Sequence, residues 1–336
     1  MIRINFVLAP ILLAITLLAS PCVAHCQTST GVTQTDPDVV DLLGGDLITL
    51  HPDGKSFAFV NNQRMITTHL LSGKQPAHEV GRNPFHPRCL SYSADASQIY
   101  CGGYNGTFSS WDIATGTRLM QSQIDPKEPI VSTSAYPELS LIFLLTRRGD
   151  VYWIDQKTFS ARGHFESGFK DCSQLVVNPA TSTLGIAGNH GFRLLSFHEG
   201  KLIHAPHIYD KVGYAAVLSP KMDMVVFETG VFGTDSSLAH LDYPHQPVYI
   251  RGRLKWFSAD EEIIVVGGTA DVHKKISPKF PDSFAGEDLQ AFSTNGKQLH
   301  AFAPDPGHDV AVTPDRKYII TWGTTGLIRV RKCSGF

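Results

Sequence analysis

The sequence has little charge of either sign and no excess of one sign over the other. Charged residues make up 18% of the 336 residues, with 29 Lys and Arg against 31 Asp and Glu, for a formal net charge of −2. No long basic run interrupts this balance. Because binding to a phosphate backbone requires clustered positive charge, the composition argues against a nucleic-acid partner.

Long apolar runs are missing beyond the N-terminus. Residues 1–24 combine Arg3, an apolar stretch over Phe6–Leu18 and the small-residue ending Cys22-Val23-Ala24, an order typical of a cleaved signal peptide. The apolar stretch is shorter than the roughly 20 residues that a membrane-spanning helix needs. We therefore expect an exported protein, periplasmic or secreted, with no membrane span after cleavage. An uncleaved signal anchor is the alternative.

Sequence signatures of catalysis and of metal or cofactor binding are also missing. The chain holds no HExxH, CxxC, EF-hand loop, G-x-S-x-G elbow or glycine-rich phosphate loop. His204 and His207 lie three residues apart, and on a strand this spacing directs them to opposite faces. We expect no metal site and no cofactor, and the sequence marks no catalytic residue.

What the chain does contain is a short turn signal that recurs about every 42 residues. A period of 40–45 residues that carries short apolar runs is typical of the blade repeat of a β-propeller. The sequence therefore predicts an all-β, seven-bladed β-propeller. The seven copies of the signal are Leu50–Lys55, Ser93–Ser97, Ala135–Ser140, Asn178–Ser182, Ser219–Asp223, Ser258–Glu262 and Thr313–Lys317.

The second unit shows best how one repeat is built. Apolar residues alternate with polar ones in short segments separated by turn residues, which predicts strands. The four predicted strands, from the innermost outward, are Cys89–Tyr92, Gln98–Cys101, Thr107–Ile113 and Thr117–Ser122.

This unit resembles a repeat of the WD-repeat family. The resemblance is carried by the Ser93–Ser97 turn, the Tyr104-Asn105-Gly106 hairpin turn, the pair Trp111-Asp112 and the following Thr115-Gly116. The other units keep the period and the turns but have lost most of the signature residues, so a secreted propeller of the YVTN type is the alternative. The resemblance implies a propeller fold and, by analogy, a binding role.

The last repeat predicts how the propeller closes. It holds only three strands before the chain ends, and an open sheet edge there would leave the ring unfastened. We therefore predict that its fourth strand comes from the N-terminal segment 25–38, near Thr30–Thr35. The predicted organisation is a signal peptide at 1–24, this closing segment at 25–38, and a propeller at 39–336 with blades near 39–82, 86–124, 129–166, 170–209, 212–251, 253–304 and 308–336.

Two pairs of cysteines are candidates for disulfides in an exported chain. Cys89 and Cys101 lie symmetrically about Asp95, so we expect them opposite each other on adjacent strands, either bonded or as two small buried apolar residues. Cys26 and Cys333 lie at the ends of the predicted closing strands, where a bond would clamp the ring.

One irregular step in the repeat isolates a candidate binding element. The distance from Ala259 to Pro314 is 55 residues instead of about 42, which locates an insertion at Ala270–Gln290 in blade six. Its mixture of basic and aromatic side chains suits an acidic protein or a glycan. A solvated loop without function is the alternative. The residues concerned are His273, Lys274, Lys275, Lys279, Phe280 and Phe284.

A second basic cluster lies between blades five and six, at Arg251 and Arg253. These arginines are candidates for a positive rim, with an ordinary solvent-exposed strand face as the alternative. Taken together, the patterns favour an exported, non-catalytic interaction scaffold that binds a protein or glycan on one propeller face. The alternative is an exported propeller enzyme, a lactonase-like hydrolase or a periplasmic dehydrogenase subunit, whose site at the central channel gathers residues from several blades.

Overall fold

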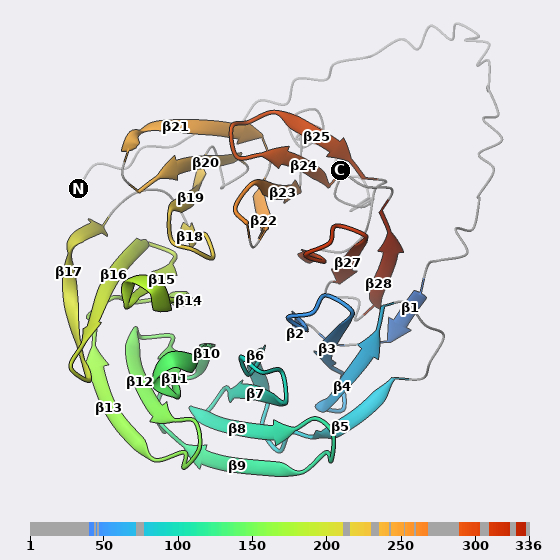
Figure 1. Ribbon diagram of the computed structural model, residues 1–336, viewed down its shortest axis with the longest axis vertical. Coiled ribbons are helices and arrows are strands. Elements are labelled where there is room, and N and C mark those ends of the chain that lie inside the picture. Colours follow the sequence, from blue (N-terminus) through green and yellow to red (C-terminus); the bar gives the residue numbers. More distant parts are fainter. Residues whose placement is uncertain are drawn as a thin grey trace, which may run out of the picture. The chain divides into compact units, whose positions relative to one another are not determined.

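The computed structural model contains seven antiparallel sheets of four strands each within the residues that it describes. These sheets belong to one compact unit, Pro37–Phe336, and form the blades of a β-propeller (Figure 1), which confirms the predicted fold class. The described residues are 40–43, 45, 47–71, 77–210, 216–229, 235–241, 243–251, 253–258, 260–267, 289–302, 309–322 and 327–333.

The first three blades each run outward from an innermost strand (Figure 1). Their strands are β2 (Leu47–Leu50), β3 (Ser56–Val60), β4 (Met65–Leu70) and β5 (His78–Arg82) in blade one; β6 (Pro87–Tyr92), β7 (Gln98–Gly103), β8 (Thr107–Asp112) and β9 (Arg118–Gln123) in blade two; and β10 (Ile130–Tyr136), β11 (Leu141–Thr146), β12 (Asp150–Asp155) and β13 (Ala161–Glu166) in blade three. A short 3₁₀ turn, η1 (Pro137–Leu139), joins β10 to β11.

Blades four to six repeat this order. Their strands are β14 (Cys172–Asn178), β15 (Thr183–Gly188), β16 (Gly191–His198) and β17 (Lys201–Asp210), with η2 (Pro179–Thr181) after β14; β18 (Ala216–Leu218), β19 (Met224–Thr229), β20 (Asp235–His240) and β21 (Tyr243–Arg251); and β22 (Arg253–Phe257), β23 (Ile263–Gly267), β24 (Gln290–Ser293) and β25 (Gln298–Ala301).

The last sheet joins the two ends of the described chain. It consists of β26 (Asp309–Val312), β27 (Tyr318–Trp322), β28 (Leu327–Lys332) and β1 (Val40–Leu43). Strand β1 pairs antiparallel with β28, from Val40 opposite Val330 to Leu43 opposite Leu327. The segment predicted for this position, 30–35, lies outside the described residues, and the strand that the structure pairs with β28 is Val40–Leu43.

The core lies between adjacent blades. Because both faces of a blade pack against neighbours, the second strand of a blade is mostly apolar, as in β11, all of whose residues are buried. Aromatic side chains fill the space between blades three and four, where Phe143 contacts Tyr136, Trp153 and Phe197 with ring centroids 6.3, 6.1 and 5.3 Å apart. Such burial is the main stabilising contribution to a sheet-only fold.

A buried polar chain ties blade one to blade two. The Trp111 indole donates to the Ser109 hydroxyl (3.3 Å), and this hydroxyl donates to the Asn83 carbonyl oxygen (3.4 Å). The Asn83 amide in turn donates to the Cys101 sulfur (2.9 Å). Asn83 follows the last strand of blade one, so this chain of hydrogen bonds crosses the blade boundary.

The prediction of a Cys89–Cys101 disulfide is wrong. Leu90, not Cys89, lies opposite Cys101, and Cys89 lies opposite Gly102, because the β6–β7 turn is centred between Asp95 and Ala96. The one-residue offset directs the two sulfurs to opposite faces of the sheet. Both cysteines are free thiols, as is Cys333. Cys26, the predicted partner of Cys333, lies outside the described residues.

We expect the buried thiols to react only when the protein unfolds. Burial raises the pKa of both Cys89 and Cys172 to about 12, so neither forms the reactive thiolate at pH 8. Iodoacetamide at pH 8 should leave both unlabelled in the folded protein and should label both in guanidinium without reductant, as read by peptide mass mapping. Labelling that requires reductant would instead reveal a disulfide.

Candidate functional site

The structure leaves the predicted binding residues untested. His273, Lys274, Lys275, Lys279, Phe280 and Phe284 lie outside the described residues, between the end of β23 and the start of β24. Arg251 lies on β21 opposite Asp235, and Arg253 lies on β22 opposite Gly267. The two arginines are therefore on adjacent blades, and their role in binding stays a prediction.

The recurring turns define one end of the propeller, which we call the turn face. Because neighbouring strands run antiparallel, the turn after the first strand of a blade and the turn after its third strand lie at the same end. The turn face consists of the first-strand turns 51–55, 93–97, 137–140, 179–182, 219–223, 258–262 and 313–317, together with the third-strand turns.

An aspartate organises several of these turns. In blade two the Ser93 hydroxyl and the Ser97 amide both donate to Asp95 Oδ1 (2.7 and 3.2 Å), and the next residue, Ala96, has a positive φ of 58°. The side chain thus replaces backbone partners that a tight turn leaves unpaired. Blade seven repeats this arrangement, since the Thr313 hydroxyl donates to Asp315 Oδ1 (2.7 Å).

The turns also connect one blade to the next. The Tyr136 hydroxyl donates to the Pro179 carbonyl (3.2 Å), which joins blade three to blade four. The Asn178 amide donates to the Lys221 carbonyl (2.8 Å), and the Lys221 ammonium donates to the Asp260 carbonyl (3.0 Å). The turn face is therefore a continuous set of contacts from blade three to blade six.

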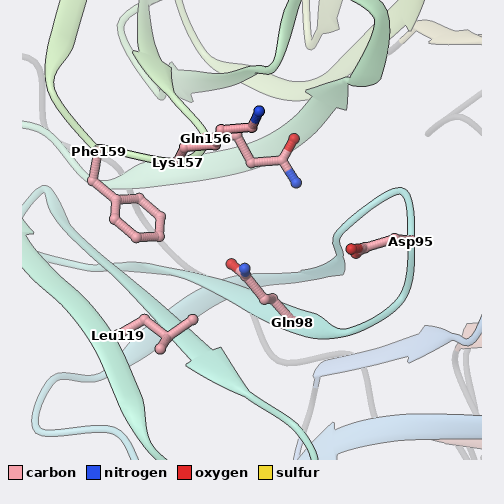
Figure 2. A pocket seen from close by; sticks show the side chains of 6 residues that line it. All are labelled: Asp95, Gln98, Leu119, Gln156, Lys157 and Phe159. Atoms are coloured by element: carbon pink, nitrogen blue, oxygen red, sulfur yellow. The ribbon is translucent and has the colours of Figure 1, made fainter.

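A pocket of about 590 Å³ opens on this face between blades two and three (Figure 2). It is lined by Asp95, Gln98 and Leu119 from blade two and by Gln156, Lys157 and Phe159 from blade three.

The pocket has a polar part and an apolar part. Figure 2 shows Asp95 on one side, the two amides of Gln98 and Gln156 facing the space between the blades, and Phe159 and Leu119 on the other side. Leu119 is 43% exposed, although it is a large apolar residue. Phe159 has a φ of 55° and packs on the buried cluster between the blades. The combination offers hydrogen bonds, a negative charge and an apolar contact at one place.

Asp155 fixes the blade-three side of the pocket. Its Oδ1 accepts from the amides of Lys157 and Thr158 (3.0 and 2.8 Å), and its Oδ2 pairs with the Arg162 guanidinium (2.7 Å). These contacts, the arginine foremost, hold the pKa of Asp155 well below its usual range. The turn that carries Gln156, Lys157 and Phe159 is thereby held in one conformation.

Asp95 differs from its counterparts in the other blades. The hydrogen bond from Ser93 holds its pKa below the ordinary value, so the carboxylate is ionised at neutral pH. Among the described residues, no cation pairs with it. Two of its three counterparts pair with a cation, namely Asp260 with Arg316 (2.6 Å) and Asp315 with Lys317 (3.1 Å), and the third, Asp53, contacts the His51 imidazole (2.6 Å).

A buried hydroxyl lies next to a residue of the pocket. Tyr100 follows Gln98 by two positions on β7, so both side chains point to the same face of blade two. The Tyr100 side chain is fully buried, and its hydroxyl lies near the Gln156 amide and the Ser93 hydroxyl without forming a hydrogen bond of good geometry. Burial raises the pKa of this hydroxyl, and the Asp95 charge adds to the rise.

The described residues hold neither a cluster of metal-binding side chains nor a helix that could span a membrane. No group of three or more His, Cys, Asp or Glu side chains there is arranged to hold a metal ion. In the same part of the chain, no helix has the length and apolar character needed to cross a membrane.

Comparison with known proteins supports the fold and does not identify a family. No protein-family model matches the sequence, and no curated protein matches it. Among solved structures, a chain from the crystal structure of a mitotic checkpoint complex is similar, with a TM-score of 0.68 and 13% identity. The match covers 95% of this chain and 99% of that chain. At this identity the likeness shows the fold alone.

The seven four-stranded sheets and this structural likeness together define a seven-bladed β-propeller.

Proposed function

We propose that the protein is a non-catalytic interaction scaffold that binds a protein partner through its turn face. The observation that carries the proposal is the pocket between blades two and three, which has an unpaired carboxylate on one side and an exposed leucine on the other. Exposed apolar side chains next to uncommitted polar groups are the usual composition of a contact surface. A glycan partner, and a second contact through the insertion at 270–290, remain predictions.

The structural likeness supports the same proposal by analogy. The similar chain comes from a structure described as a complex, so that propeller works within an assembly. Propellers present rigid faces with loops and turns at both ends, which suits them to hold partners.

The proposal includes export, on the basis of the signal-peptide pattern at residues 1–24. Mass spectrometry of the protein recovered from the cells that make it tests this part. We expect a mature N-terminus at His25 and recovery outside the cytoplasm. A protein that retains Met1 and stays in the cytoplasm would contradict export while leaving the scaffold proposal intact.

The scaffold proposal is tested by chemical cross-linking followed by purification of the full mature protein. We expect one protein to copurify at a fixed ratio, measured by light scattering after size-exclusion chromatography, and to rebind after separation. A protein that elutes alone under all cross-linking conditions would contradict the proposal.

A further inference from the structure

We propose that the pocket between blades two and three is a peptide-binding site that takes a basic side chain at Asp95 and a neighbouring aliphatic side chain at Leu119 and Phe159. The inference rests on the scaffold function proposed above and names the chemistry of the segment that the scaffold recognises. The partner is a protein segment in extended conformation that carries a Lys or Arg next to a Leu, Ile or Val.

The basic position follows from the comparison among turn aspartates. The same turn recurs in four blades with an aspartate at the same place; two of the four carboxylates pair with an arginine or lysine within the protein, and a third contacts the His51 imidazole. Asp95 has no such partner among the described residues, and its turn hydrogen bonds all fall on Oδ1. Its Oδ2 is therefore available to an external cation, which forms the stronger, charge-assisted type of hydrogen bond.

The aliphatic position follows from the opposite side of the pocket. Leu119 is an exposed leucine on the outer strand of blade two, and Phe159, from the third-strand turn of blade three, lies on the same side of the pocket (Figure 2). Contact of these two apolar side chains with water is unfavourable, and an aliphatic side chain that covers them removes this surface from water.

The groups between these two positions suit a peptide backbone. The amides of Gln98 and Gln156 each offer a donor and an acceptor, and Lys157 offers a further donor at the blade-three side. A neutral sugar would donate hydroxyl hydrogen bonds to Asp95 and to the amides but would bring no positive charge to pair with the carboxylate. The observations therefore favour a basic peptide over a glycan.

The buried Tyr100 hydroxyl gives the pocket a further polar group. Gln156 lies near this hydroxyl and also lines the pocket, but the two groups do not form a hydrogen bond of good geometry. A ligand that fixes the Gln156 amide gives the hydroxyl a permanent acceptor.

The test uses the full mature protein and three capped octapeptides that differ at one position. Each has the form Gly-Ser-Ala-X-Leu-Ala-Ser-Gly, where X is Arg, Gln or Glu, and binding is measured by saturation-transfer NMR and by isothermal titration. We expect the Arg peptide to bind, the Gln peptide to bind about tenfold more weakly, and the Glu peptide not to bind. Affinity for the Arg peptide should fall with added salt. A neutral oligosaccharide serves as the probe for the glycan alternative.

Matched variants locate the binding. Asp95→Asn keeps an acceptor for the turn and removes the charge, so affinity for the Arg peptide should fall about tenfold. Asp315→Asn makes the same change in the equivalent turn of blade seven and should leave affinity unchanged. Leu119→Ser should weaken binding, whereas Ile203→Ser, at an exposed apolar position of blade four, should not.

Tyr100→Phe separates binding from folding. Removal of this hydroxyl, which forms no hydrogen bond of good geometry, should leave the unfolding midpoint unchanged or higher and should weaken peptide binding by a factor of about three. Equal binding of all three peptides, preference for the oligosaccharide, or equal loss in the Asp95 and Asp315 variants would overturn the peptide site. The scaffold function would then be decided separately, by the copurification experiment.

Discussion

Replacement of Phe143 by alanine is expected to destabilise the protein by about 3–5 kcal/mol, which makes it one of the two largest single-residue effects that we predict. The Phe143 side chain is fully buried and lies against the rings of Tyr136, Trp153 and Phe197. Alanine would leave a cavity between blades three and four that rigid strands on both sides cannot fill. The loss corresponds to a fall of roughly 10 °C in the unfolding midpoint.

Thermal unfolding followed by calorimetry measures this effect. Phe143→Leu should lower the free energy of unfolding by clearly less than Phe143→Ala, because leucine retains most of the apolar volume. Leu119→Ala, at an exposed position, should change the stability by less than about 0.5 kcal/mol. A Phe143→Ala protein as stable as the Leu119 variant would show that the aromatic cluster does not form.

The second large effect is expected at Gly106. This glycine has a φ of 71°, and an added Cβ would lie 1.5 Å from the Asp125 carbonyl oxygen. The backbone of Asp125 is held in place because its amide, like that of Ile124, donates to the Gly106 carbonyl (3.2 and 2.8 Å). Gly106→Ala must therefore displace the segment that connects blade two to blade three and break its hydrogen bonds to the Gly106 carbonyl. We expect the free energy of unfolding to fall by more than about 3 kcal/mol.

Gly200 provides the matched control for this substitution. Its φ of 76° is similar, but no atom lies within 4 Å of an added Cβ. Gly200→Ala should therefore lower the free energy of unfolding only by the strain of placing alanine at a positive φ, about 1–2 kcal/mol. Urea unfolding of the two variants compares them directly, and equal midpoints would contradict the predicted collision at Gly106.

Much of the fold was predictable because the turn after the first strand of a blade requires particular residue types. Turns such as 93–97 and 313–317 need a hydroxyl, an aspartate and a residue that tolerates positive φ within five positions, so the requirement is visible in sequence. The strands predicted for blade two overlap all four observed strands for the same reason.

The error at the cysteines arose where one residue of register decides the outcome. The spacing of Cys89 and Cys101 is symmetrical about Asp95, whereas the turn is symmetrical about the bond between Asp95 and Ala96, and this difference places the two sulfurs on opposite faces. The segment expected to close the propeller, near 30–35, lies outside the described residues, and the strand that pairs with β28 is Val40–Leu43. Local sequence does not specify the register of strands that are distant along the chain.

The candidate pocket was not predictable, because its two halves meet only after the blades pack. Leu119 and Phe159 are 40 positions apart and belong to different blades. A partial signal was present, since the turn at 93–97 has no basic residue whereas the turn at 313–317 has Arg316 and Lys317. That contrast is informative only once the structure is known, because a neighbouring blade can supply the missing cation. Arg316 of blade seven does so for Asp260 of blade six.

The claim that the protein binds a protein partner at this pocket is tested most directly by site-specific photo-cross-linking in the cells that make it. A photoreactive benzoylphenylalanine is introduced at Leu119 or, as the control, at Ile203, which is also exposed. We predict one discrete protein adduct from position 119 that is lost when Asp95→Asn is added, and none from position 203. The absence of an adduct at 119, or the same adducts from both positions, would contradict the account.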